Sequence, residues 1–289
     1  MDIRAISMGL LFAFIWSSAF TSARIIVADA SPVASLALRF LVSGLIGVAI
    51  AKAMGQTWKL TRAQWQATLV FGICQNALYL GLNFVAMQWI EASLASIIAS
   101  SMPLLVALAG WVIFKDTLPK LGQIGMVAGF LGVILIMGSR LGGGVDPLGI
   151  GLCIIGAMGL ATATMIMRGA SSGGNVMMIV GLQMLVGSAV LAVPAVLFED
   201  VHVNFTWPLV LAFSYTTLAP GLLATWIWFK LVQRIGAVKA ATFHFLNPFF
   251  GVSVAALILG ESLGKTDVIG VIIITLGILA VQLSKQKPT

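Results

Sequence analysis

The sequence predicts an all-α integral membrane protein with ten transmembrane helices, arranged as two inverted five-helix repeats. Three observations support this fold class. Hydrophobic residues make up 60% of the chain and charged residues only 9%, whereas a soluble domain carries about a quarter charged residues. The apolar residues fall into ten stretches, and each has about the 20 residues that a helix needs to cross a bilayer. The second half of the sequence also repeats the first.

The ten predicted spans follow one another with short connections, which leave no room for a soluble catalytic domain. Each span is predominantly apolar, as expected of a helix that satisfies its own backbone hydrogen bonds in lipid. The first span is too long for the apolar core of a signal peptide, so we expect it to be retained. The spans cover residues 5–27, 33–51, 65–88, 92–114 and 120–138 in the first half, and 147–167, 175–197, 207–231, 237–259 and 266–284 in the second.

The repeat appears as a nearly constant offset between equivalent residues. From about residue 88 onward the offset is 145, so Pro103 aligns with Pro248 and Asp116 with Glu261; upstream it is 144. Because each half has five spans, an odd number, the second half must lie inverted in the bilayer. Inverted repeats are typical of secondary transporters whose substrate site lies near the midplane. The predicted units are a first repeat at 1–141, a glycine hinge at 142–146 and a second repeat at 147–289.

The basic residues indicate a membrane topology. The net charge of +7 would also suit nucleic-acid binding, but we expect no nucleic-acid partner because the positive charges follow the positive-inside rule. With the N-terminus in the cytoplasm, only Arg140 and Lys265 fall in outer loops, and both termini are cytoplasmic. The basic residues on the cytoplasmic side are then Arg4, Lys52, Lys59, Arg62, Lys115, Lys120, Arg168, Lys230, Arg234, Lys239, Lys285 and Lys287.

Three prolines near the middle of spans are candidate gating positions: Pro103 in span 4, Pro220 in span 8 and Pro248 in span 9. A proline inside a helix removes one backbone hydrogen bond and kinks the helix. One interpretation is a kink that only sets the shape of the bundle. Pro103 and Pro248 are repeat mates, however, and matched interruptions in the two halves point to the substrate site.

Polar and aromatic side chains at mid-membrane depth are candidate substrate ligands. Trp16 lies near the centre of span 1 beside Ser17, and Tyr79 shares a face of span 3 with Asn83, four residues on. A Trp N–H or Tyr O–H left in lipid would be unsatisfied. We therefore predict that these side chains line a cavity.

Spans 4 and 9 supply a second set of candidates. Ser96 and Ser100 lie on one face of span 4, followed by Met102, and small residues at this spacing suit either close helix packing or a cavity lining. In span 9, His244 and Asn247 precede the proline. His244 is either bonded to a nearby carbonyl or contacts the substrate. It is the mid-span side chain that could couple transport to protons near neutral pH.

Arg39 is the deepest basic residue, and its repeat mate is Gln183. We interpret it as a source of interhelical hydrogen bonds, with binding of a substrate carboxylate as the alternative. All nine acidic residues fall in loops or at span ends, which disfavours export of polycations. The absence of a mid-membrane Lys/Arg cluster disfavours phosphorylated substrates. A neutral cavity with adaptable methionines suits a small amphipathic metabolite, such as a zwitterionic amino acid.

Three stretches carry a resemblance to a known family. They run from Ala92 through Pro103 to Asp116, from Ala237 through Pro248 to Glu261, and over Trp16-Ser17-Ser18-Ala19-Phe20. The chain resembles the drug/metabolite transporter superfamily, EamA type, and within it the aromatic amino acid exporters of the YddG type. The resemblance implies export of aromatic amino acids and related compounds through a central cavity that opens alternately to each side.

The combined expectation is a transporter of the bacterial inner membrane that exports aromatic or other neutral amino acids by alternating access. The lack of a mid-membrane carboxylate favours facilitated diffusion. The alternative is a broad-specificity exporter of neutral or weakly cationic compounds, with or without coupling to protons. A channel-like pore is a further alternative, and an enzyme is disfavoured. We expect no cofactor and no metal, with the lipid bilayer and a small-molecule substrate as partners, and a monomer or, alternatively, a dimer.

Overall fold

The computed structural model describes residues 3–113, 115–166 and 174–284. Over these residues it contains ten helices long and apolar enough to cross a membrane. The described chain is helical throughout, apart from connections and one isolated bridge between Ala30 and Val203, which confirms the predicted fold class. Arg168, Lys285 and Lys287, used above for the topology, lie outside the described residues.

The helices of the first repeat begin and end close to the predicted spans. Two of the five spans are divided: α3, η1 and α4 form the third, and α5 and α6 form the fourth. The bounds are α1 Ile3–Asp29, α2 Pro32–Ala53, α3 Arg62–Val70, η1 Phe71–Leu80, α4 Gly81–Ala86, α5 Ala92–Ser100, α6 Met102–Val112 and α7 Lys120–Gly142.

The second repeat is divided at the equivalent places. Its third span consists of α10, η2 and α11, and its fourth of α12, η3 and α13. The bounds are α8 Pro147–Ile166, α9 Val176–Phe198, α10 Trp207–Thr216, η2 Thr217–Leu223, α11 Ala224–Ile235, α12 Ala237–Ala241, η3 Thr242–Leu246, α13 Asn247–Leu259 and α14 Lys265–Ser284.

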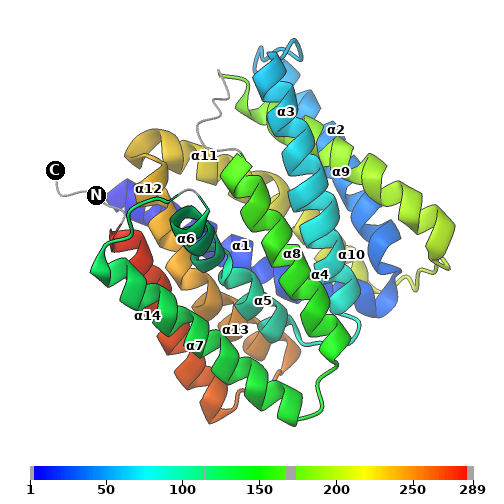
Figure 1. The fold of residues 1–289 in the computed structure, drawn as a ribbon. Helices are drawn as coiled ribbons and strands as arrows, with labels where there is room; N and C mark the ends of the chain where they lie inside the picture. The colour runs from blue at the N-terminus through cyan, green and yellow to red at the C-terminus, as the bar shows by residue number, and fades with distance from the viewer. Residues whose placement is uncertain (1–2, 114, 167–173, 285–289) are drawn as a thin grey trace.

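Equivalent helices of the two repeats pack against each other. Figure 1 shows α2 beside α9 at one edge of the bundle and α7 beside α14 at another, and both pairs are in extensive contact. Glycines permit the close approach of α7 and α14: a Cβ at Gly125 would lie 2.7 Å from the carbonyl oxygen of Gly277. Gly132 and Gly270, their repeat mates, meet in the same way. Each of these two contacts therefore joins a helix of the first repeat to the equivalent helix of the second.

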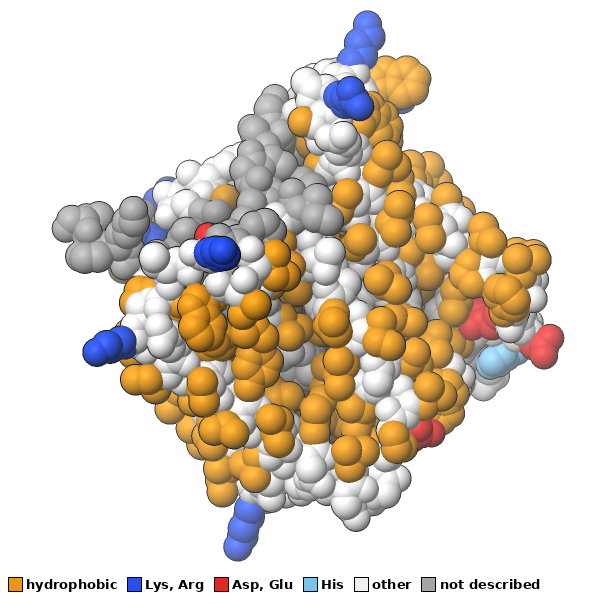
Figure 2. All heavy atoms as spheres, in the orientation of Figure 1, with side chains coloured by type: hydrophobic (Ala, Val, Ile, Leu, Met, Phe, Trp, Pro, Cys, Tyr) orange, Lys and Arg blue, Asp and Glu red, His pale blue; other side chains and the backbone are white. Residues whose placement is uncertain are grey.

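The surface is as apolar as a lipid-facing surface requires. Figure 2 shows hydrophobic side chains spread over most of the visible face, with Lys and Arg side chains at its edges. Large side chains on the outside of the bundle include Leu131 on α7, Val196 on α9 and Leu257 on α13. Lipid covers such side chains at no cost, since it is as apolar as they are.

The two repeats lose regular α-helical geometry at matching positions. η1 and η2 are π-helical segments in the third span of each repeat. Pro220 lies inside η2, whereas Pro103 and Pro248 lie in the first turn of α6 and α13. These two prolines were expected inside continuous helices. Instead, each helix restarts at its proline, after a break at Ser101 in one repeat and a 3-10 segment in the other, because a first-turn N–H needs no helical partner.

Carboxylates cap helices at the distal end of the bundle, defined here as the end where α1 terminates at Asp29. Glu261 accepts hydrogen bonds from the backbone N–H groups of Ala92 (2.8 Å) and Ser93 (2.9 Å) at the start of α5. Arg140 bridges Glu91 (2.6 Å) and Asp267 (2.9 Å). These contacts tie the two repeats together at the end that the sequence predicts to be outside.

Candidate functional site

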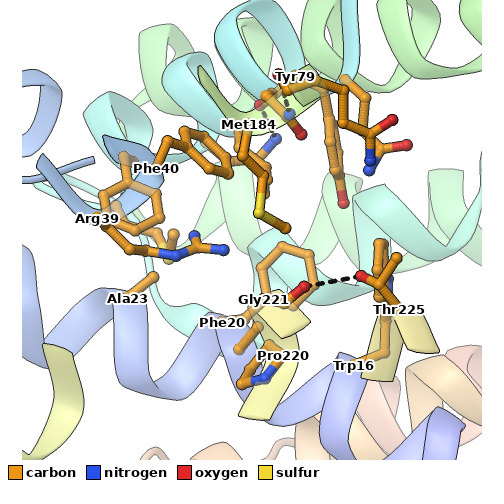
Figure 3. A pocket seen from close by; sticks show the side chains of 18 residues that line it. Trp16, Phe20, Ala23, Arg39, Phe40, Tyr79, Met184, Pro220, Gly221 and Thr225 are labelled. Atoms are coloured by element: carbon orange, nitrogen blue, oxygen red, sulfur yellow. Dashed lines mark hydrogen bonds between the residues drawn. The ribbon is translucent and has the colours of Figure 1, made fainter. Parts of the chain in front are cut away.

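A central cavity of about 600 Å³, part of it open to solvent, lies between helices of both repeats. Figure 3 shows side chains from α1, α2, α9 and the two π-helical regions around it. The lining residues are Trp16, Ala19, Phe20, Ala23, Arg39, Phe40, Gln75, Asn76, Tyr79, Leu80, Asn83, Phe84, Met87, Gln183, Met184, Pro220, Gly221 and Thr225.

Equivalent residues of the two repeats line the cavity. Ten of the lining residues form five pairs of repeat mates, at the offset of 144 for α2 and α9 and of 145 for the third spans, so the longer offset begins before residue 88, where the sequence analysis placed its start. A site shared by equivalent positions is what an inverted-repeat transporter requires, because both halves must contact the substrate as they move. The pairs are Arg39 with Gln183, Phe40 with Met184, Gln75 with Pro220, Asn76 with Gly221 and Leu80 with Thr225.

Side chains at the cavity wall hold the local backbone. The Asn76 side chain in η1 donates to the carbonyl of Gln183 in α9 at 3.0 Å, which links the two repeats directly. Asn83 donates to the carbonyl of Tyr79 at 2.8 Å. In the other π-helical region, Thr225 donates to the carbonyl of Gly221 at 2.8 Å, the bond drawn in Figure 3. The π geometry is therefore supported by side chains that face the site, a frequent feature of π segments at functional positions.

The chemistry of the lining is aromatic and amide-rich with a single charge. Arg39 is the one charged side chain among the described residues that line the cavity. An apolar or aromatic ligand would contact the rings and the methionines, and its polar groups would meet the amides and the guanidinium. The aromatic rings are those of Trp16, Phe20, Phe40, Tyr79 and Phe84, and the amides are those of Gln75, Asn76, Asn83 and Gln183.

Four of the predicted functional residues lie at this cavity: Trp16, Tyr79, Asn83 and Pro220. Trp16 reaches it from α1 and Tyr79 from η1, and Figure 3 shows both at one side of the cavity. The Tyr79 ring is almost fully buried in the protein. The structure thus brings together side chains that are distant in sequence, in the way that the polar-residue argument predicts.

Four predicted ligands lie outside this cavity. Ser17 of α1 and Ser96 of α5 lie where α1, α5 and α13 meet, Ser100 follows in α5, and Met102 begins α6. Ser17 and Ser96 are fully buried there, and neither hydroxyl has a hydrogen-bond partner within the described part of the chain. A Cβ at Gly251 of α13 would collide with the Ser96 side chain, so this contact is tight. Ser100 donates to the carbonyl of Ser96 at 2.7 Å, and Met102 is partly buried against the core. The structure therefore shows these side chains in a helix contact, outside the cavity lining.

His244 and Asn247 also lie outside the lining. Their side chains are hydrogen-bonded to each other at 2.9 Å. The His244 ring packs against Phe12 and Trp228, at centroid distances of 5.4 and 5.1 Å. The partner of His244 in the structure is thus a side-chain amide, where the sequence suggested a backbone carbonyl or the substrate.

Several lining residues were not among the predicted ligands, most importantly Gln183, Met184 and Phe40. A signal for them exists in the sequence, because Gln183 and Met184 are the repeat mates of Arg39 and Phe40. Pairing mid-span polar residues by the repeat offset would have found this part of the site.

Comparisons with known proteins agree with the fold. The family model described as the EamA-like transporter family matches residues 3–138 and again 147–283. The uncharacterized transporter YvbV of Bacillus subtilis (strain 168) is 25% identical over 282 residues, covering 96% of this chain and 92% of its own. Protein PecM of Dickeya dadantii (strain 3937) is 22% identical, covering 93% and 89%.

A solved structure shows the same fold. A protein crystal structure superimposes with a TM-score of 0.68 at 19% identity and covers 98% of each chain. The uncharacterized inner membrane transporter YedA of Escherichia coli (strain K12) is 25% identical, covering 96% of this chain and 90% of its own. The ten helices form two repeats of five, and the family model matches each half of the chain. This protein is therefore a member of the EamA-like transporter family.

Proposed function

We propose that the protein exports aromatic and other neutral amino acids, or closely related metabolites, across the bacterial inner membrane. The observation that carries this proposal is the cavity itself, which combines five aromatic rings with four amides at the junction of the repeats. Aromatic rings suit contact with an aromatic side chain, and amides suit hydrogen bonds to its polar groups. Trp16 and Tyr79 would flank the ring of the substrate.

The proposed mechanism is alternating access. The π-helical segments η1 and η2 and the helix breaks before Pro103 and Pro248 occur at equivalent places in both repeats. Such breaks are places where a span can bend, because the regular hydrogen-bond ladder is interrupted there. Movement of one repeat against the other would then expose the cavity to each side in turn. The described cavity lining holds no carboxylate, which favours facilitated diffusion over exchange with protons.

The test is uptake of labelled phenylalanine and tryptophan into liposomes that contain the purified protein, with and without a pH gradient. We expect saturable uptake that does not depend on the gradient and that shows counterflow. His244→Ala should leave the gradient independence unchanged, since His244 is bonded to Asn247 away from the cavity lining. Lack of uptake of both amino acids would refute the substrate class. Uptake driven by the gradient and abolished in His244→Ala would replace facilitated diffusion with proton coupling.

The second candidate is a broad-specificity exporter of neutral or weakly cationic compounds. The thioethers of Met87 and Met184 favour it, because flexible methionines adapt a cavity to ligands of different shapes. Competition by a panel of uncharged aromatic compounds with phenylalanine uptake separates the two candidates. Strong competition by most of the panel supports the broad exporter, and competition confined to amino acids supports the first proposal.

A further inference from the structure

Arg39 is a charged side chain inside the membrane-spanning region, and it has no ionic partner among the residues that the structure describes. It belongs to α2, is only 4% exposed and lines the central cavity. Its Nε atom has no hydrogen-bond partner among the residues described. Its guanidinium carbon lies 4.7 Å from the centre of the Phe40 ring, a cation–π contact that supplies no hydrogen-bond acceptor. A charge buried in this way is unfavourable unless something else neutralises it.

The Arg39 guanidinium faces the cavity, where a ligand could bind, and no carboxylate of the described lining faces it. Figure 3 shows the guanidinium extending into the cavity, with Met184 reaching toward the same space. The glycine at position 221 faces it: a Cβ there would lie 3.8 Å from Nη2 of Arg39. No Asp or Glu belongs to the described cavity lining.

We propose, building on the proposed function, that Arg39 binds the carboxylate of the substrate and that the substrate class is monocarboxylates with an aromatic or apolar tail. A guanidinium presents parallel N–H groups that match a carboxylate, and the pair is strong where water is excluded. The lining offers no opposite charge to an ammonium group. The carboxylate is therefore the required group, and the ammonium of an amino acid is dispensable.

The aromatic side chains account for the tail of such a substrate. Trp16 and Tyr79 lie across the cavity from Arg39 in Figure 3, with Phe20 between the two sides. A ligand bound through its carboxylate to Arg39 would direct a ring toward these residues, where stacking contributes to affinity. The single charge belongs to one repeat, and its mate Gln183 is neutral, so the described lining presents one cation to the ligand.

The experiment compares three ligands that share one ring and differ in charge: phenylalanine, 3-phenylpropionate and phenethylamine. Binding of each to the purified full-length protein is measured by calorimetry, for wild type, Arg39→Gln and Arg39→Lys. We expect wild type to bind phenylalanine and 3-phenylpropionate within about 10-fold of each other and phenethylamine at least about 10-fold more weakly than either. Arg39→Gln should weaken both carboxylates by about 30-fold or more, and Arg39→Lys should recover part of that loss. Arg4→Gln, which removes an exposed charge far from the cavity, should bind like wild type.

Several results would overturn the proposal. Equal binding of phenethylamine and 3-phenylpropionate to wild type would refute the proposal. This comparison needs no variant, so it remains a test even if Arg39→Gln folds poorly. An unchanged affinity of folded Arg39→Gln for the carboxylates would also refute it. Arg39-dependent binding of 3-phenylpropionate without binding or transport of phenylalanine would uphold the carboxylate site and refute amino acid export. Binding of none of the three would refute both.

Discussion

Single residues at mid-membrane depth indicate the location of the cavity where their polar groups make exposure to lipid unfavourable. Trp16, Tyr79 and Asn83 line the cavity, and each has a polar group that must be satisfied in the protein; their contact with substrate stays a prediction. The same argument was too weak for Ser17 and Ser96. A serine that promotes helix contact and a serine that lines a cavity have the same side chain and the same spacing, so sequence alone does not separate the two roles.

Tyr79 provides a test at this scale. Tyr79→Ala removes a ring from the cavity wall, and we expect the KM for phenylalanine to rise about 5-fold, since an aromatic pair contributes about 1 kcal/mol beyond burial. Tyr79→Phe keeps the ring and should change KM by less than about 3-fold. Trp58→Ala, an exposed position outside the site, is the control. Equal effects of Tyr79→Phe and Tyr79→Ala would show that the hydroxyl, not the ring, carries the interaction.

Whole elements were predicted more reliably than their irregularities. The spans agree with the helices to within a few residues, because the length of an apolar stretch fixes a crossing helix. The prolines predicted a kink in the fourth span of each repeat, where the structure has a break at Ser101 and a 3-10 segment. Nothing in the sequence predicts the π-helical η1, which has no proline and is stabilised by contacts between elements, such as the bond from Asn76 to α9.

The contact between α7 and α14 gives a prediction for an element. Gly125→Ala should destabilise the protein by about 1–3 kcal/mol, the usual cost of overpacking, since its Cβ would lie 2.7 Å from the carbonyl oxygen of Gly277. Gly138→Ala lies on the same helix with no other atom within 4 Å of its Cβ. It should be neutral or slightly stabilising, because alanine favours helix. Thermal unfolding in detergent measures both. Equal melting temperatures for the two variants would show that the helices separate easily.

At the scale of the whole molecule, the repeat was the most useful property of the sequence. It predicted a site between the halves, and the cavity contains five pairs of repeat mates. The sequence could not predict which face of each helix points toward the cavity, because in a membrane protein the lipid-facing side is as apolar as the buried side. The location of Gln183 and Met184 in the site therefore became clear only from the packing of α2 against α9.

The orientation in the membrane is testable on the whole molecule. Val201 and Trp58 are 62% and 68% exposed, in connections at opposite ends of the bundle. A membrane-impermeant maleimide added to intact cells should label Val201→Cys and leave Trp58→Cys unlabelled until the cells are opened. The unaltered chain, whose Cys74 and Cys153 lie within spans, gives the background. The reverse labelling pattern would place the N-terminus outside.

The pairing of α2 with α9 and of α7 with α14 also has a consequence for biosynthesis. The first repeat enters the membrane with two helix faces whose partners have not yet been translated. Until α9 and α14 arrive, lipid or an assisting protein must cover the glycine face of α7. We therefore expect a chain ending at residue 141 to be degraded when made alone. Co-expression with residues 142–289 should restore it to a stable, purifiable complex.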